Sequence, residues 1–369
     1  MSTRTFALSG EFVTRARGGG PVSVRRVLLV KMSSLGDLVH ALPAVTDAAA
    51  HGISFDWVVE EAFAALPARH PAVAQVLPIA WRRWRHRLWR DRGELRAFFA
   101  RLRQERYDLV LDAQGLVKSA VVSAAAQSGA RAGFDWQSAR ESLAALAVRH
   151  RIFVPREAHA IARQRALFAG ALQYALPQSD APLDFGISAA ASHRRRELGL
   201  KPLCLLLHGT TWASKQWPES YWCELAWRAR DAGFEVALPA GTVDEAARAE
   251  RIASASHATA WPRVPLAALL DDLAGADLVI GVDSGLLHAS AALGVPTVGL
   301  YLSTDAERTG CLGPRAQMLR TDFPCAPCGS RACGYRGPRV ADHAIDIAPI
   351  CATRLTPARV WAAAEAALR

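Results

Sequence analysis

Short runs of aliphatic and β-branched residues alternate with amphipathic helical segments along this chain, and the alternation restarts near its middle. A run that is apolar at every position is typical of a parallel strand buried on both faces. Strand–helix alternation that begins twice predicts an α/β fold of two doubly wound parallel sheets lying side by side. The predicted strands are 27–30, 55–59, 109–111, Leu203–Leu207, Glu235–Leu238, Leu278–Val282 and Thr297–Tyr301.

Helical segments are predicted between these strands. Leu95, Phe98, Phe99 and Leu102 recur at the i, i+3, i+4, i+7 spacing of a buried helix stripe. Further helical segments are 37–50, 219–232, 244–255, 266–273 and 285–293.

The chain divides into an extension and two domains. Residues 1–24 contain the Gly18-Gly19-Gly20-Pro21 segment and lack the apolar core of a signal peptide, so we expect a flexible extension outside the fold. The N-terminal domain is predicted at 25–178 and the C-terminal domain at 179–369, joined near 176–185, where proline and polar residues cluster. We expect the helix at the C-terminus to pack back on the N-terminal domain.

Composition narrows the class of protein. The 369 residues are 51% hydrophobic and 21% charged, which is typical of a globular protein, and no apolar run approaches the roughly 20 residues of a membrane span. The formal charge of +10 favours a polyanionic partner: nucleic acid, an anionic membrane surface or a phosphorylated substrate. Seven cysteines without a secretory signal predict reduced thiols in a cytoplasmic setting.

Open parallel sheets bind ligands at the carboxyl ends of their strands, and polar residues follow three of the predicted strands. In the first of these segments, 31–40, Gly36 permits a tight turn, and Asp37 is either a helix cap or a general base facing an interdomain cleft.

The other two segments follow strands of the second half. Segment 208–218 offers a glycine, hydroxyls and Lys215, which suit a phosphate, although an ordinary loop fits equally and the Walker A spacing is missing. Asp283, Ser284 and Gly285 open a helix whose first backbone amides form an anion site, and His288 lies one turn further on. His288 is either structural or a ligand contact.

Residues 81–90 contain five arginines and three tryptophans. Arginine suits bidentate binding of phosphate and carboxylate, and tryptophan suits a membrane interface. The alternative is a solvated helix face with its tryptophans in the core.

Four cysteines, Cys325, Cys328, Cys333 and Cys351, follow a spacing that suits a thiolate zinc site. The distant fourth cysteine favours an ordered loop without metal, so we predict no metal site.

Four motifs resemble the ADP-heptose:lipopolysaccharide heptosyltransferases of glycosyltransferase family 9, over roughly residues 25–320. They are Lys31-x-Ser33-Ser34-x-Gly36-Asp37, the segments 55–61 and 112–119, and Asp283-Ser284-Gly285-x-x-His288. The resemblance is strongest to the heptosyltransferase I branch. It implies a GT-B fold of two Rossmann-like domains. It also implies an inverting, metal-independent transfer of L-glycero-D-manno-heptose from ADP-heptose to the inner Kdo of Kdo2-lipid A, without a cofactor.

The resemblance also implies roles for individual residues. Asp37 corresponds to the catalytic carboxylate, and Lys215 stabilises the departing ADP. The implied donor-binding residues are Thr210, Thr211, Lys215, Glu245, Asp283, Ser284, Gly285 and His288. The implied acceptor-binding residues are Arg82, Arg83, Arg85 and Arg140. No Asp-x-Asp tripeptide is present in the sequence, so a lysine and a helix N-terminus would stabilise the leaving diphosphate in place of a metal.

Such an enzyme is expected in the cytoplasm, in transient contact with the inner membrane and without a nucleic-acid partner. Three alternatives remain open. The cysteine-rich segment is not typical of the heptosyltransferase I branch, so the first alternative is a heptosyltransferase II-like enzyme that adds a heptose to heptosyl-Kdo2-lipid A. A non-catalytic nucleotide-binding module would explain the sheets but would not need Asp37. A nucleic-acid-binding protein would explain the charge, but no signature of such a fold is found in the sequence.

Overall fold

The uniformly apolar runs form the centres of two six-stranded sheets, one in each half of the chain. This computed structural model describes residues 26–87, 89–178, 181–188, 199–338, 341–342, 345–346 and 348–369. The expected extension, 1–24, lies outside the described residues. All seven predicted strands are confirmed, and so is the α/β fold of two doubly wound parallel sheets.

The first sheet has the strand order β3-β2-β1-β5-β7-β8, with every pair parallel. Val27, Leu28, Leu29 and Val30 are fully buried because helices cover both faces of the central strand. The strands are β1 (Arg26–Val30), β2 (Ser54–Glu60), β3 (Val73–Ile79), β5 (Leu109–Asp112), β7 (Arg131–Phe134) and β8 (His150–Ile152).

The second sheet repeats this plan in the order β11-β10-β9-β12-β13-β14, again all parallel. Its strands are β9 (Leu203–Leu207), β10 (Glu235–Leu238), β11 (Thr259–Ala260), β12 (Leu278–Val282), β13 (Thr297–Tyr301) and β14 (Ala316–Arg320). Two short pairs lie outside both sheets: β4 (Arg106–Tyr107) with β6 (Gln127–Ser128), and β15 (Ala341–Asp342) with β16 (Ile345–Asp346).

Helices connect the strands, as their amphipathic patterns predict. Phe98 and Leu102 of the predicted stripe are buried, and Leu95 and Phe99 pack beside them. In the first domain the α-helices are α1 (Leu35–Val39), α2 (Leu42–Ala49), α3 (Trp81–Trp84), α4 (Arg92–Leu102), α5 (Val117–Ala125) and α6 (Ala160–Leu172). In the second they are α8 (Glu219–Asp231), α9 (Val243–Ser256), α10 (Leu266–Ala274), α11 (Gly285–Ala292), α12 (Ala306–Thr309) and α13 (Pro357–Leu368). The 3₁₀ turns are η1 (Glu61–Phe63), η2 (Pro67–Arg69), η3 (Ser142–Ala147), η4 (Ala213–Lys215) and η5 (Ile350–Arg354).

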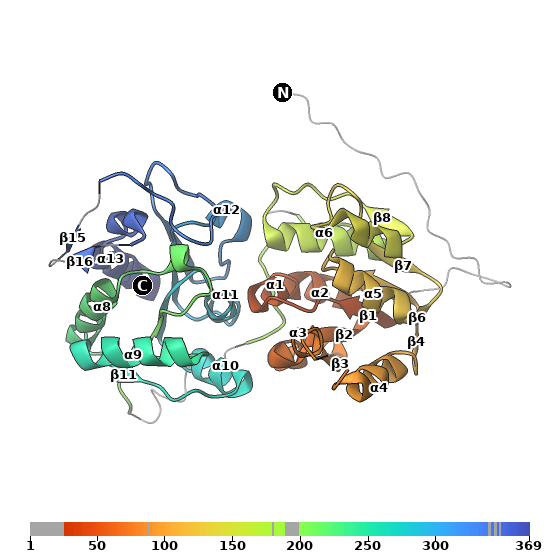
Figure 1. Ribbon diagram of the computed structural model, residues 1–369, viewed down its shortest axis with the longest axis horizontal. Coiled ribbons are helices and arrows are strands. Elements are labelled where there is room, and N and C mark those ends of the chain that lie inside the picture. The colour runs from red at the N-terminus through yellow and green to blue at the C-terminus, as the bar shows by residue number, and fades with distance from the viewer. Residues whose placement is uncertain are drawn as a thin grey trace.

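The two domains lie side by side and meet where α1 packs against α11 (Figure 1). Glycines allow the close approach: a Cβ on Gly285 would lie 2.6 Å from the Leu35 Cβ, and one on Gly36 would lie 3.0 Å from His288. Both glycines belong to the motifs that the sequence singles out. The expected boundary at 178/179 falls in the connection between α6 and β9 and stays a prediction.

The predicted packing of the C-terminal helix is wrong. Helix α13 packs against α8 and the strands β13 and β14 of its own domain. Its buried face, which includes Val360, Trp361 and Ala364, joins the apolar cluster under that sheet. An apolar stripe requires burial but does not specify which surface covers it, which is why the sequence pattern could not identify the correct domain.

In each sheet the connections reverse direction beside the central strand, between β1 and β5 and between β9 and β12. Ligands of open α/β sheets bind outside the carboxyl ends of the strands at such points. Among the residues that the structure describes, no helix is long and apolar enough to cross a membrane.

Candidate active site

Residues from both domains line a cleft of about 530 Å3 at the carboxyl ends of the central strands. The first domain contributes the start of α1, including Asp37. The second contributes the loops after β9 and β12, including Lys215 and Asp283. The structure therefore brings together the three polar segments that the sequence singles out.

Asp37 stands in the first turn of α1, where it contributes to the helix cap and lines the cleft, and its role as a general base stays a prediction. Its Oδ2 accepts hydrogen bonds of 2.8 Å from the backbone N–H and the hydroxyl of Ser34, which caps the helix start. The same carboxylate lines the cleft. Burial raises the pKa of Asp37, but the Lys31 ammonium and the Ser34 hydrogen bonds outweigh it and hold the pKa below its ordinary value. The side chain is therefore an anion that can accept a proton.

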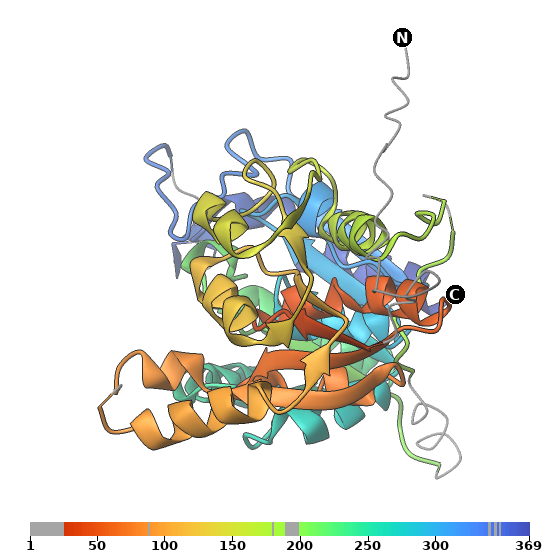
Figure 2. The ribbon, with the colours of Figure 1, turned by 90° about the vertical axis from the view of Figure 1, so that its right-hand side faces the viewer.

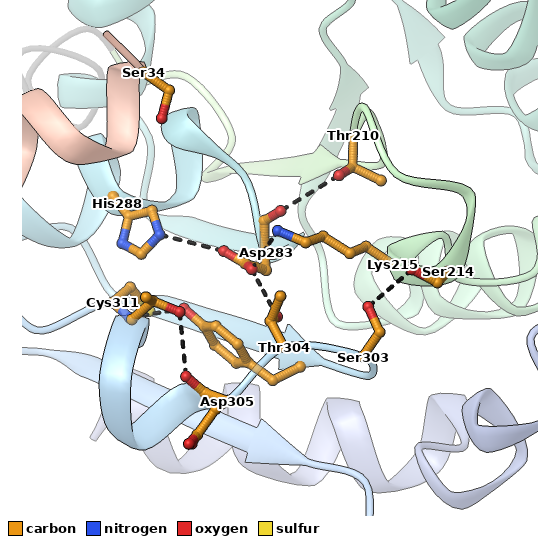
Figure 3. A network of polar contacts seen from close by, with 12 residues as sticks. Ser34, Thr210, Ser214, Lys215, Asp283, His288, Ser303, Thr304, Asp305 and Cys311 are labelled. Atoms are coloured by element: carbon orange, nitrogen blue, oxygen red, sulfur yellow. Dashed lines mark hydrogen bonds and ion pairs between the residues drawn. The ribbon is translucent and has the colours of Figure 1, made fainter. Parts of the chain in front are cut away.

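Asp283 is the centre of a polar network on the opposite wall (Figure 3). Its Oδ2 accepts from Lys215 Nζ and from the Thr304 hydroxyl, each at 2.7 Å. Its Oδ1 lies 3.3 Å from His288 Nε2, and its carbonyl accepts from the Thr210 hydroxyl at 3.4 Å. Burial works to raise the pKa of Asp283, but His288 and Lys215 lower it well below the usual value.

Lys215 is positioned by two contacts of its own ammonium and by a hydrogen bond of the preceding residue, Ser214. Besides its ion pair with Asp283, its ammonium lies 4.6 Å from the centre of the Trp212 ring. The neighbouring Ser214 is buried, and its hydroxyl bonds Ser303 Oγ at 2.9 Å. The loop that carries the ammonium is thereby tied to the segment after β13 that carries Thr304.

The start of α11 lines the cleft directly after Asp283, on the wall that the second domain forms. Ser284 is its N-cap, and the Ser284 hydroxyl is buried without a partner. The amides of the first helical turn have no partners within the helix, so they and the helix dipole favour an anion at this point. With Lys215 nearby, this wall is suited to a diphosphate.

Glu245 also lines the cleft, but its immediate task is structural. Its Oε2 accepts from the backbone N–H groups of Gly241 at 2.8 Å and Thr242 at 3.1 Å, and so caps α9. The other oxygen faces Gly209, where a Cβ would come within 2.5 Å of it. Thr211 lines the same cleft.

A second cavity of about 670 Å3 opens on the other side of Asp37, which lines both. The positive groups around it are Lys31, Arg140, Arg156 and Arg163 of the first domain and Arg308 of the second. The sequence reasoning found only Arg140 among these arginines.

Two buried polar atoms on α6 at this second cavity lack partners: Arg163 Nε and Gln164 Oε1. Burial lowers the pKa of Arg163, and repulsion from Arg156 and Arg308 lowers it further. A cluster of cations with an unused donor and an unused acceptor is suited to an anion that also carries hydroxyl groups.

The other predicted acceptor residues lie on or after α3. Arg82 is exposed and lines the cleft that contains Lys215, with its guanidinium 5.1 Å from the centre of the Phe63 ring. Arg83 is half-buried and paired with Glu94 at 2.7 Å and Glu61 at 3.4 Å, and Arg85 donates to His86.

The tryptophans of this stretch differ in burial, and a membrane role for the exposed one stays a prediction. Trp84 is buried in the core, whereas Trp89 is 88% exposed.

The four cysteines of the C-terminal segment, Cys325, Cys328, Cys333 and Cys351, line one cavity of about 420 Å3 behind η4. They are free thiols. Within the described ranges, no three histidine, cysteine or acidic side chains are grouped so as to hold a metal ion. The backbone of this segment supports the loop that carries Lys215, because Ser214 N–H donates to the Arg331 carbonyl.

Comparison with known proteins gives three findings. A family described as glycosyltransferase family 9 (heptosyltransferase) matches residues 95–337. The chain is 47% identical to lipopolysaccharide heptosyltransferase 1 of Pseudomonas aeruginosa, over 93% of this chain and 98% of that protein. Lipopolysaccharide heptosyltransferase 2 of Escherichia coli is 31% identical over only 37% of this chain and 40% of its own length.

Among solved structures, that of E. coli heptosyltransferase WaaC with ADP-2-deoxy-2-fluoro heptose is similar. It superposes with a TM-score of 0.73 and 36% sequence identity, covering 92% of this chain and 99% of that one.

Proposed function

Because the chain belongs to glycosyltransferase family 9 (heptosyltransferase) and has the GT-B fold of that family, we propose that it transfers L-glycero-D-manno-heptose from ADP-heptose to the inner Kdo of Kdo2-lipid A. The resemblance seen in the sequence motifs is thereby confirmed at the level of the family. The chain is a glycosyltransferase, and the relatives that it matches over most of its length are lipopolysaccharide heptosyltransferases.

One observation carries the proposal: Asp37 of the first domain and the cationic wall around Lys215 of the second line the same cleft. Inverting transfer needs a base and a leaving group on opposite sides of the anomeric carbon. In this arrangement Asp37 takes the proton of the acceptor hydroxyl as its oxygen bonds to the anomeric carbon. The bond from that carbon to the diphosphate oxygen breaks, and ADP departs with the bonding electrons.

The leaving diphosphate gains negative charge in this step, and the second domain supplies the groups that stabilise it. These are the Lys215 ammonium, the hydroxyls of Thr210 and Thr211, and the amides at the start of α11. Asp283 holds Lys215 at 2.7 Å, so the ammonium is positioned before the charge develops. We propose that Glu245, Ser284, Gly285 and His288 complete the donor site.

The second cavity suits the acceptor sugar. Kdo carries a carboxylate and several hydroxyls, which match the cations and the unpaired Arg163 and Gln164 atoms around that cavity. Asp37 stands where the two cavities meet, so a hydroxyl of a sugar held there would face the anomeric carbon of the donor. Arg82 and Arg85 are exposed and extend the positive surface beyond the cleft, and we propose that they contact the phosphates of lipid A. Arg83 could join them only by leaving its pairs with Glu61 and Glu94.

The choice between the two acceptors rests on similarity. The heptosyltransferase 1 relative matches nearly the whole chain, including the first domain, whereas the heptosyltransferase 2 relative matches little more than a third of it. We therefore favour Kdo2-lipid A over heptosyl-Kdo2-lipid A. Since either acceptor is anchored in a bilayer by its acyl chains, we propose peripheral association with the cytoplasmic face of the inner membrane.

A transfer assay tests this function. ADP-heptose and a UDP-hexose are each offered with Kdo2-lipid A and with heptosyl-Kdo2-lipid A, before and after treatment with EDTA. We expect product only from ADP-heptose and Kdo2-lipid A, at a rate that EDTA leaves unchanged. If product forms with heptosyl-Kdo2-lipid A but not with Kdo2-lipid A, the proposed acceptor is wrong. Loss of activity with EDTA would contradict metal-independent transfer.

A further inference from the structure

We propose that an exposed apolar patch on the first domain, formed by α5, η3 and the β8 region, docks on an anionic lipid bilayer. The patch adjoins the second cavity, so docking there would bring a lipid-anchored acceptor to Asp37. The inference rests on the proposed function for the identity of the acceptor. The docking itself can be measured without any transfer reaction.

The patch gathers six exposed large apolar side chains. Soluble proteins rarely leave such residues together at the surface without a partner. Their exposed fractions are 43% for Val117, 47% for Val121, 41% for Trp136, 64% for Leu143, 67% for Leu146 and 61% for Phe153.

Helix α5 and turn η3 form the centre of the patch and pack against each other. Val117 and Val121 are four residues apart in α5 and so project from the same side of the helix. Leu143 and Leu146 are three residues apart in a 3₁₀ turn, where such side chains eclipse one another. The two elements are joined by a 2.7 Å hydrogen bond from Val117 N–H to Glu141, the N-cap of η3.

Arg151 connects the other two aromatic residues to this centre. Its guanidinium lies 5.2 Å from the centre of the Trp136 ring, and its Nε donates to the Ala145 carbonyl of η3 at 2.9 Å. Phe153 is two residues further along the extended chain and is exposed like Arg151, whereas Val154 is buried. The six residues therefore belong to one continuous surface.

The charge around the patch identifies the kind of partner. Arg140, Arg149, Arg151 and Arg156 are exposed in the chain segments that form it and outnumber the exposed acidic residues of these segments, Glu141 and Glu157. Arginine side chains are attracted to an anionic bilayer, and tryptophan is favoured at the headgroup level. An apolar surface with a cationic rim matches a bilayer of anionic lipid better than it matches a neutral or cationic protein surface.

The position of the patch fits delivery of the acceptor. Arg140 and Arg156 belong both to its rim and to the second cavity. Figure 2 shows α5 on the same side of the domain as α3 and α4, whose connecting segment carries the exposed Trp89. A bilayer on this side would contact both features, and the acceptor sugar would enter the second cavity past Arg140 and Arg156.

Vesicle sedimentation tests the docking directly. The wild-type chain and a Leu143→Ser/Leu146→Ser variant are mixed with phosphatidylglycerol–phosphatidylethanolamine vesicles and with phosphatidylcholine vesicles. We expect the wild type to bind the anionic vesicles and the variant to bind them about tenfold less, because binding scales with the apolar area buried in the interface. Equal binding by both proteins, or no binding by the wild type, would overturn the proposal.

Trp136 and Trp227 provide a matched pair, because they are 41% and 42% exposed and Trp227 lies on α8 of the other domain. Trp136→Ala should weaken vesicle binding severalfold. Trp227→Ala should not. An equal loss in both would contradict a specific patch, and so would a dimer that Leu143→Ser/Leu146→Ser converts to a monomer in light scattering.

Transfer rates on two forms of the acceptor distinguish a failure of the docking proposal from a failure of the proposed function. With acceptor embedded in vesicles, the Leu143→Ser/Leu146→Ser variant should lose activity in parallel with binding. With a de-acylated, water-soluble acceptor, it should match the wild type. Equal loss on both acceptors would overturn docking as the role of the patch. Failure of the wild type on both acceptors would contradict the proposed function and leave the vesicle measurement to decide the docking.

Discussion

His40 of α1 and His288 of α11 contact each other across the domain interface, with His40 Nε2 and His288 Nδ1 3.3 Å apart. Both rings are buried. His288 Nε2 lies 3.3 Å from Asp283, so a hydrogen-bonded path runs from the helix that carries Asp37 to the carboxylate that holds Lys215.

The charge of Asp283 fixes the direction of one of these hydrogen bonds. An anionic carboxylate can only accept, so His288 donates from Nε2 to Asp283. Burial and His288 hold the pKa of His40 well below its usual value, so the ring remains neutral.

Replacing His40 tests whether this contact matters for the reaction. A glutamine keeps a hydrogen-bonding group near the position of Nε2, whereas leucine fills the space without one. We expect His40→Leu to lose about tenfold in kcat, the equivalent of one net hydrogen bond, and His40→Gln to retain most of it. Equal kcat in the two variants would show that the hydrogen bond between the two domains is not needed.

Lys215 should matter more for the rate than for the stability of the fold. Lys215→Ala removes the ammonium that compensates the departing diphosphate, so we expect kcat to fall about 10²- to 10³-fold, as when an oxyanion donor is removed. Lys215→Arg should recover part of the loss because the charge is kept. Single-turnover kinetics measure this directly, with Lys201→Ala, on the exposed surface before β9, as the control. A Lys215→Ala variant with wild-type kcat would remove the lysine from the mechanism.

Much of this architecture could be predicted from local sequence patterns. Every predicted strand formed, because a short, mostly apolar run bounded by polar segments is suited to burial inside a sheet that helices cover on both faces. The loops with Asp37, Lys215 and Asp283 could be found because each directly follows such a run.

Other features depend on contacts between distant segments. Arg163 and Gln164 lie on α6, and Arg308 lies on α12 of the other domain, so no spacing in the chain connects them. Thr304 contacts Asp283 from the turn after β13, in a segment that has no recognisable pattern. The patch around Leu143 and Leu146 was missed because exposure is not visible in the sequence.

Replacing Arg163 should weaken acceptor binding without weakening donor binding. Arg163→Gln removes a half-buried cation from the second cavity, so we expect the KM for acceptor to rise about tenfold, consistent with a charge-assisted hydrogen bond. The KM for ADP-heptose should change less than twofold. The matched control is Arg228→Gln, since Arg228 pairs with Glu224 on the surface of α8. A parallel rise of both constants would argue against an acceptor role for this cavity.

Because His208 is buried, we expect the free energy of unfolding to fall in acid. Burial, followed by repulsion from Arg248, lowers the pKa of His208 to about 4 in the folded chain, against about 6.5 when unfolded. The unfolded chain therefore takes up the proton first as pH falls. Stability that is fully present above pH 6.5 is lost between about pH 6.5 and 4, by up to about 3 kcal/mol. His208→Gln should flatten this part of the Tm-against-pH curve, whereas His51→Gln, at an exposed site, should not. An unchanged slope in His208→Gln would contradict the assignment.

The central claim is that Asp37 acts as the base opposite a diphosphate site. Asp37→Asn is the sharpest substitution, because its amide oxygen can still accept from Ser34 and preserve the start of α1. The decisive measurement is single-turnover transfer by Asp37→Asn beside its affinity for ADP-heptose. We predict a loss of about 10³-fold in the transfer rate, within the range of general-base catalysis, with donor affinity unchanged within about threefold. A variant that transfers heptose at the wild-type rate would contradict the mechanism.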